Sequence, residues 1–249
     1  MMKKFTVLSI FTCLMLVASL LLSSCAALFE TVPQEPRYAP SFDFSRAETT
    51  QANSQNITIA LINPIFHDSK KNSALYHEPY STFISNMAND FEELLTAKGF
   101  TIRGPFGSRD EMVYGDKKNS ALALEIEVDL KQDGRPTISS YSGYSTMYYK
   151  VRGSFYHHGN LNITITNPMN GEKFWKKSVA LPRKEIVCNG TKKFNRRPST
   201  SEMLIDNGVY NPLAKALEEY YTSALNMASK HMSPEEFKVI AKEIKGANQ

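Results

Sequence analysis

Hydrophobic and polar residues alternate strictly over residues 121–130. The apolar positions are Leu122, Leu124, Ile126, Val128 and Leu130, and the positions between them are Ala123, Glu125, Glu127 and Asp129. Successive side chains of a β-strand point to opposite faces of its sheet. The segment is therefore predicted to form a strand with one buried face and one solvated, acidic face.

Other stretches have strand patterns of different kinds. Residues 57–62 form a near-continuous apolar run, which predicts a strand covered on both faces. Further strand-like segments are residues 100–104, 148–156, 161–167 and 172–181. The last two flank the sequence NPMNG at 167–171, which predicts a hairpin turn because Asn170 and Gly171 tolerate positive φ.

Two long helices and several short ones are predicted from apolar residues at helical spacing. The first long helix covers residues 80–98, with Gly99 just after its end, and the second covers 211–231, with Pro212 at its first position. Ser108 and Glu111 have the spacing of a capping box before a short helix to about Lys118. Ser233 and Pro234 begin a last helix that Gly246 closes.

These elements predict an α+β fold, with a mixed or antiparallel sheet packed against the helices. The chain order starts with a strand, helix, strand unit made of residues 57–62, 80–98 and 100–104. Residues 183–208 show no clear period and are predicted to form a loop. Its first part, 183–197, carries six basic residues and one acid, so it is locally basic.

The amino terminus has the pattern of a lipoprotein signal peptide. Lys3 and Lys4 precede an apolar run from Val7 to Leu22, and Leu22-Ser-Ser-Cys25 follows as a small-residue cleavage site. Residues 1–24 are predicted to be removed, and Cys25 is predicted to receive acyl chains such as palmitate. Several acyl chains hold a protein stably on a membrane without a transmembrane helix. An uncleaved signal anchor is the alternative, although the run is shorter than the ~20 residues that a spanning helix needs.

The remaining chain is divided into two parts. Residues 25–56 are rich in Pro, Ser, Thr, Gln and Asn, which predicts a flexible tether, and residues 57–249 are predicted to form a single globular domain. In an alternative interpretation, Phe42 and Phe44 dock on the domain as an arm. Cys188 is the only cysteine left for the domain, so no disulfide within it is expected.

Composition excludes several classes of function. The formal charge of +4 falls to +2 without Lys3 and Lys4, which is too near neutral for a whole-surface nucleic-acid binder. The common nucleotide, hydrolase, metalloprotease and redox motifs are absent from the sequence, so we expect no enzyme and no cofactor. His157 and His158 would point to opposite faces of a strand, so they are expected to be turn or surface residues rather than metal ligands.

A tyrosine-rich stretch, residues 135–149, has the composition of a recognition loop. Arg135 and Arg152 could hold a carboxylate such as that of sialic acid, while Tyr141 or Tyr144 stacks on the sugar ring. A plain hairpin tip is the alternative. The basic segment 183–197 could contact anionic lipid, glycan or an acidic protein, and a solvated loop is its alternative.

The order of these features resembles the neuraminyllactose-binding haemagglutinin family. The resemblance is carried by the signal peptide, the strand at 121–130 and the segments LLTAKGFTI at 94–102, ITITNPMNGE at 163–172 and KVIAKEIKG at 238–246. It implies a surface or flagellar-sheath adhesin lipoprotein of Gram-negative bacteria that attaches to sialylated host glycans without enzymatic activity. In that family a Lys/Arg/Thr-rich stretch after the alternating strand was proposed to bind sialic acid, and here it corresponds to Arg135 and Thr137.

The sequence thus favours an outer-membrane lipoprotein on the cell surface or flagellar sheath that acts as an adhesin. Its candidate ligand-binding residues are Arg135, Thr137, Tyr141, Tyr144 and Arg152. The alternative is a periplasm-facing lipoprotein that docks on an envelope or sheath protein through the basic segment. For the adhesin, many copies on one cell would supply avidity, so each single contact can be weak.

Overall fold

The computed structural model describes residues 35–44, 54–67, 73–142, 147–193 and 199–248. Contacts divide the chain into two units, Met1–Pro36 and Arg37–Gln249, and all helices and strands of the described residues belong to the second unit. The predicted signal peptide and Cys25 lie outside the described residues. Within the described residues, no helix combines the length and the hydropathy needed to cross a membrane.

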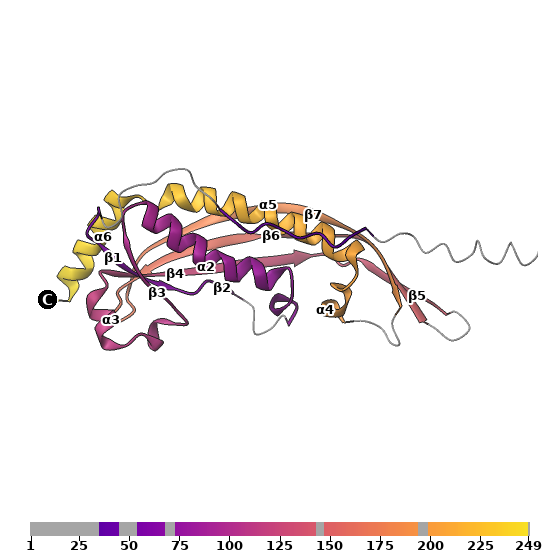
Figure 1. Ribbon diagram of the computed structural model, residues 1–249, viewed down its shortest axis with the longest axis horizontal. Helices are drawn as coiled ribbons and strands as arrows, with labels where there is room; N and C mark the ends of the chain where they lie inside the picture. The colour runs from indigo at the N-terminus through magenta and orange to yellow at the C-terminus, as the bar shows by residue number, and fades with distance from the viewer. Residues whose placement is uncertain (1–34, 45–53, 68–72, 143–146, 194–198, 249) are drawn as a thin grey trace, which may run out of the picture. The chain divides into compact units, whose positions relative to one another are not determined.

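A seven-stranded mixed sheet forms the centre of this unit (Figure 1). Its strands are β1 Thr58–Ile62, β2 Ile65–Phe66, β3 Thr101–Phe106, β4 Leu122–Asp133, β5 Thr137–Ser142, β6 Met147–Thr166 and β7 Lys173–Lys193. The order is β3-β1-β4-β6-β5, with β2 beside β4 and β7 beside β6. β1 is parallel to both β3 and β4, whereas β6 is antiparallel to β4, β5 and β7. The predicted α+β class and the strand, helix, strand start are confirmed.

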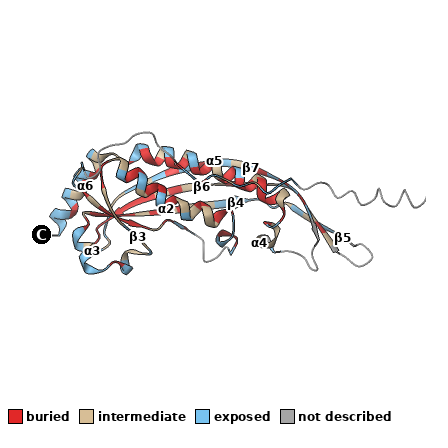
Figure 2. Ribbon diagram, viewed as in Figure 1, coloured by how far each residue is buried: buried red, intermediate tan, exposed pale blue. Residues whose placement is uncertain are grey.

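The two long helices cover one face of the sheet, and the segment around α3 lies at the other. The helices are α2 Tyr80–Ala97, α3 Tyr114–Asn119, α4 Thr200–Met203, α5 Asn207–His231 and α6 Pro234–Ala247, with single 3-10 turns at Ser73–Tyr76 and Arg109–Glu111. Met112, just before α3, packs against Ala60, Ile62 and Ala123 in a second, smaller cluster. α2 and α5 lie side by side over the sheet and turn their buried sides toward it (Figure 2). Phe83, Phe91, Tyr221 and Phe237 are among the largest fully buried side chains of this layer.

Most predicted helix signals are confirmed. Gly99 follows α2 with a φ of 90°, and Ser233 caps α6 by accepting the N–H of Glu236 at 3.1 Å. The second long helix begins earlier than predicted because Asp206 caps it by accepting the N–H of Gly208. Pro212 therefore lies inside α5 rather than at its first position.

The prediction of a loop at 183–208 is wrong. Residues up to Lys193 continue strand β7, and α4 and the start of α5 follow. Ile186, Cys188 and Gly190 are buried, whereas Val187 and Asn189 between them are exposed, so this segment has the period of two of a half-buried strand. The density of basic residues hid this alternation.

Phe42 and Phe44 dock on the domain, as in the arm alternative. Phe42 is 3% exposed and Phe44 8% exposed, and both belong to the main hydrophobic core. The Phe42 ring lies 5.5 Å from the ring of Phe83 in α2 and 5.3 Å from that of Tyr221 in α5. Residues 37–44, which we call the arm, therefore fill the space between α2 and α5.

Candidate functional site

β4 and β5 pair with β6 in one continuous antiparallel register. Asp133 at the end of β4 lies opposite Tyr156, and Thr137 at the start of β5 lies opposite Arg152. The pairing ends at Ser142 and Met147, and residues 143–146 between them lie outside the described residues. β5, residues 147–157 of β6 and residues 184–193 of β7 make up the part of the sheet that we call the distal ribbon.

The distal ribbon has one face against the helices and one open face. Val151, Phe155, Ile186 and Cys188 are buried in the main core on the helix side. Residues that lie directly opposite each other on neighbouring strands share a face. The open face therefore carries the alternate positions of each strand, which include Thr137, Tyr141, Arg152 and Val187.

The structure brings three predicted site residues together on this open face. Thr137 and Arg152 are a directly opposed pair, and both are exposed. Tyr141 is 52% exposed and lies opposite Tyr148, and their rings stack with centroids 5.3 Å apart and an interplanar angle of 11°. Arg135 is exposed in the short interruption between β4 and β5. Tyr144 lies outside the described residues.

Lys150 also lies on the open face, although it was not among the predicted site residues. It is opposite Ser139, two residues along the strands from the opposed pair of Thr137 and Arg152. Among the described residues, no carboxylate forms an ion pair with Lys150 or Arg152. Both cations are therefore available to an anionic ligand. The period of two over residues 148–156 was the signal that could have placed Lys150 with Arg152.

A second aromatic and basic pair lies farther along β6. The Arg183 guanidinium stacks on the Tyr156 ring at 3.5 Å, and its Nε lies 3.7 Å from Asp133 Oδ2. The Tyr156 hydroxyl donates to Glu185 at 3.3 Å. Since Arg183 already has an aromatic and an acidic neighbour, it is less free than Arg152 to bind a ligand.

The acidic row on β4 lies on the solvated face of that strand, as predicted. Each of its carboxylates has a partner: Glu125 accepts the Thr166 hydroxyl at 3.2 Å, Glu127 lies 3.1 Å from His67 Nδ1, and Asp129 lies 3.5 Å from Lys131 Nζ. Because these partners belong to β4, β6 or the residue after β2, the row stabilises the sheet.

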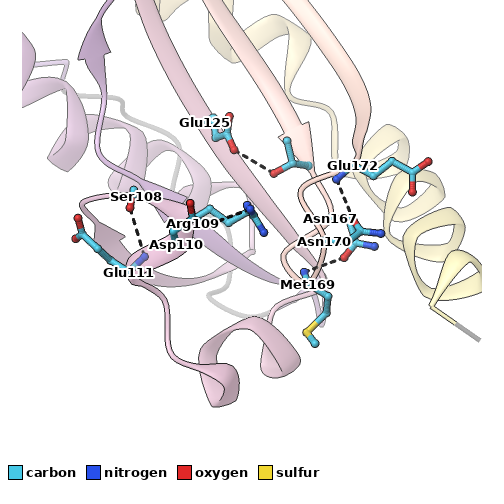
Figure 3. A network of polar contacts seen from close by, with 10 residues as sticks. Ser108, Arg109, Asp110, Glu111, Glu125, Asn167, Met169, Asn170 and Glu172 are labelled. Carbon is cyan, nitrogen blue, oxygen red and sulfur yellow. Dashed lines mark hydrogen bonds and ion pairs between the residues drawn. The ribbon is translucent and has the colours of Figure 1, made fainter. Parts of the chain in front are cut away.

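The polar network around the 167–171 turn is structural (Figure 3). Asn167 Oδ1 accepts the N–H of Met169, and Asn170 Oδ1 accepts that of Glu172, both at 2.9 Å. Gly171 takes a φ of 80°, but Asn170 does not take a positive φ. The hairpin turn is thus confirmed, with Gly171 as the residue of positive φ and the Asn170 side chain accepting a backbone N–H within the turn.

His157 is not a surface residue, contrary to the sequence expectation. It is 2% exposed, and its Nε2 lies 3.2 Å from the Tyr80 hydroxyl. Val151 and Phe155 of the same strand are buried on the helix side, and both lie an even number of residues from His157. Because alternate residues of a strand share a face, His157 also faces the helices. Within the described part of the chain, no group of three or more His, Cys, Asp or Glu side chains could hold a metal ion.

One solved structure has a closely related arrangement of strands and helices. It is a crystal structure of a neuraminyllactose-binding hemagglutinin homologue from Helicobacter pylori, which aligns with a TM-score of 0.57 over 84% of this chain and 100% of that chain. The sequences are 15% identical. The two chains share a fold. The sequence resemblance to the neuraminyllactose-binding haemagglutinin family is therefore supported at the level of the fold, and membership of the family stays a prediction.

Other solved structures align less well. Rare lipoprotein B from Shewanella oneidensis aligns with a TM-score of 0.31 and 10% identity over 72% of this chain and 98% of that chain. A lipoprotein from Neisseria meningitidis gives a TM-score of 0.27 and 13% identity over 64% and 99%. No protein-family model and no curated protein sequence matches the chain.

Proposed function

We propose that this chain is an envelope lipoprotein of the outer membrane or flagellar sheath that acts as a non-enzymatic adhesin for sialylated glycans. The lipidation sequence ending in Cys25 supports the membrane anchor. The fold shared with a neuraminyllactose-binding hemagglutinin homologue supports the choice of ligand class. The binding site is the open face of the distal ribbon.

The opposed pair of Thr137 and Arg152 carries this proposal, together with the stacked tyrosines that lie four residues along the strands on the same face. A guanidinium binds a carboxylate through two parallel hydrogen bonds, and this geometry suits the carboxylate of sialic acid. The Thr137 hydroxyl can accept from or donate to a sugar hydroxyl beside it. The exposed face of Tyr141 offers a rigid apolar surface to the ring. The three groups lie on paired strands rather than in a loop.

The docked arm shortens the link between the anchor and the site. The tether was predicted to extend to residue 56, but Arg37 already belongs to the compact unit. Dense display on the cell would convert weak single contacts into avidity.

Titration of the full-length protein in detergent with sialyllactose and with lactose tests the site. Sialyllactose is expected to bind and lactose to bind much more weakly, because lactose lacks the carboxylate. Arg152→Ala should weaken sialyllactose binding at least tenfold, about 1.4 kcal/mol. Lys118→Ala, which removes one positive charge from an exposed position in α3, is the matched control and should bind as the wild type does. Equal binding of both sugars, or unchanged binding by Arg152→Ala, would contradict the proposal.

Protease accessibility on intact cells tests the exposure of the domain. An adhesin has to be cleaved by added protease without permeabilisation. Protection on intact cells, with cleavage after permeabilisation, would support the alternative of a periplasm-facing lipoprotein that docks on an envelope or sheath protein.

A further inference from the structure

His157 lies at the junction between the distal ribbon and the rest of the sheet. The register between β6 and β7 shifts between His157 and Gly159. At this irregularity the Tyr220 hydroxyl of α5 contacts the carbonyl oxygens of both His157 and Pro182 at 2.7 Å. Tyr80, which contacts the imidazole, is the first residue of α2. The distal ribbon therefore extends beyond the N-terminal end of α2 (Figure 1).

The imidazole of His157 is buried and only partly hydrogen-bonded. Its ring centroid lies 5.0 Å from that of Phe155 and 5.9 Å from that of Tyr80. Nδ1 is buried without a hydrogen-bond partner among the described residues. Burial lowers the pKa of His157 to about 4, and the adjacent His158 lowers it further to a smaller extent. The side chain is therefore neutral at pH 7.

The charged groups around this ring do not compensate an added proton. Lys184 lies opposite His157 on β7, and its ammonium pairs with Glu219 of α5. The partner of His157 on β4 is Gln132, which is neutral. From α2 the ring meets only the Tyr80 hydroxyl, and the Cys188 thiol on β7 is also protonated because burial raises its pKa to about 11.

The remaining titratable or charged groups near His157 lie on the other side of the sheet. His158 points to the open face, where its Nδ1 lies 3.5 Å from Asp133 Oδ2, and Arg183 lies near the same carboxylate. Within the described residues, no carboxylate contacts the His157 ring. An imidazolium there would be an unpaired cation in the core with Lys184 as its nearest charged strand partner, and such a charge is costly to bury.

We propose that His157 is a pH-sensitive latch that holds the distal ribbon against α2 and α5 when it is neutral and releases it when it is protonated. Opening hydrates the imidazolium and gives Nδ1 a water partner. Arg152 and Tyr148 lie on the same strand within nine residues of the latch, so ligand release in acid follows; this consequence rests on the proposed function.

Amide hydrogen exchange of residues 148–156 in the full-length protein tests the latch without any ligand. Linkage between an ordinary pKa of 6.5 and a folded pKa of about 4 raises the opening equilibrium by about 20-fold from pH 7 to pH 5, after correction for intrinsic exchange. His157→Gln keeps a neutral polar side chain and should lose this rise. His158→Gln, on the open face, is the matched control and should keep it.

Three results would overturn the latch. One is the same acid-induced rise in His157→Gln as in the wild type. Another is an equal rise for the amides of residues 122–128, which would indicate global unfolding. If His157→Gln does not fold, an NMR titration of the wild-type imidazole decides instead: a pKa near 4 supports the latch, and an ordinary value overturns it. Failure of sialyllactose binding would leave all of these measurements intact.

Discussion

The Tyr221 hydroxyl donates a 2.6 Å hydrogen bond to Asp90 Oδ2, which is the oxygen that also accepts the N–H of Phe44 at 2.9 Å. Asp90 belongs to α2, Tyr221 to α5 and Phe44 to the arm. One buried carboxylate thus joins three segments that are far apart in the chain. Asn86 adds a hydrogen bond to the carbonyl of Phe42 at 2.9 Å. The arm is therefore a structural part of the domain.

Removal of the Phe42 ring should destabilise the whole domain. Phe42→Ala deletes a 3% exposed side chain between two helices, and we expect a loss of about 3–5 kcal/mol in the free energy of unfolding. Ser41→Ala, at the exposed neighbouring position, is the control and should change it by less than about 0.5 kcal/mol. Chemical denaturation of both variants measures this. Equal effects would mean that the arm adds nothing to stability.

Asp90 should make the domain less stable as pH rises. Burial raises the pKa of Asp90, although the hydrogen bonds from Tyr221 and Phe44 act in the opposite direction. The carboxyl holds its proton more tightly in the folded state than in the unfolded state. Its contribution to the free energy of unfolding is therefore fully present below the ordinary pKa of about 4 and is lost as pH rises through the raised pKa.

Denaturation of the wild type and Asp90→Asn at pH 4 and pH 7 tests this sign. The wild type should lose stability relative to Asp90→Asn on going from pH 4 to pH 7, because the amide does not ionise. Asp110→Asn, whose side chain is 83% exposed, should follow the wild type at both pH values. Parallel pH profiles of the wild type and Asp90→Asn would contradict the assignment.

The contact between α5 and β7 should tolerate no side chain at Gly208. A Cβ there would lie 2.1 Å from the backbone oxygen of Asn189, so Gly208→Ala is expected to cost about 1–3 kcal/mol. Because Asn189 lies opposite Arg152, sialyllactose binding should weaken as well. Gly246→Ala in α6 meets no atom within 4 Å and should leave the melting temperature unchanged or slightly raised. Similar melting temperatures for the two variants would show that α5 and β7 can move apart at Gly208 without a loss of stability.

Lipid labelling should separate the two cysteines of the processed chain. Cys188 is 1% exposed and burial raises its pKa to about 11, so its thiol is inaccessible and protonated. Labelled palmitate should enter the wild type and Cys188→Ala in growing cells, but not Cys25→Ala. Label retained in Cys25→Ala would disprove the predicted anchor.

Elements with a regular local pattern could be predicted from the sequence. The apolar spacing of residues 80–98 and the glycine after them gave α2 and its end to within one residue. The alternation at 121–130 predicted β4, although the strand runs on to Asp133. The basic segment 183–193 was missed because side-chain charge carries no information about backbone pairing. Its buried positions have the strand period even so.

The candidate site was only partly predictable. Tyrosine and arginine in one stretch indicated a recognition surface, yet the composition did not show that Thr137 lies opposite Arg152 and Tyr141 opposite Tyr148. Those pairs follow from the register of β5 against β6. A shift of one residue would put these side chains on the helix face.

The sequence by itself determined what depends on neighbours in the chain: the end of α2, the cap of α6, the hairpin turn and the periods of the main elements. The tertiary structure alone decided that Phe42 and Phe44 are core residues, that His157 is buried beneath Tyr80, and that Arg152 faces outward with Thr137. These outcomes depend on contacts between residues that are distant in the chain. Such contacts are set by packing and strand register. A local pattern shows only which residues of one strand or helix share a face.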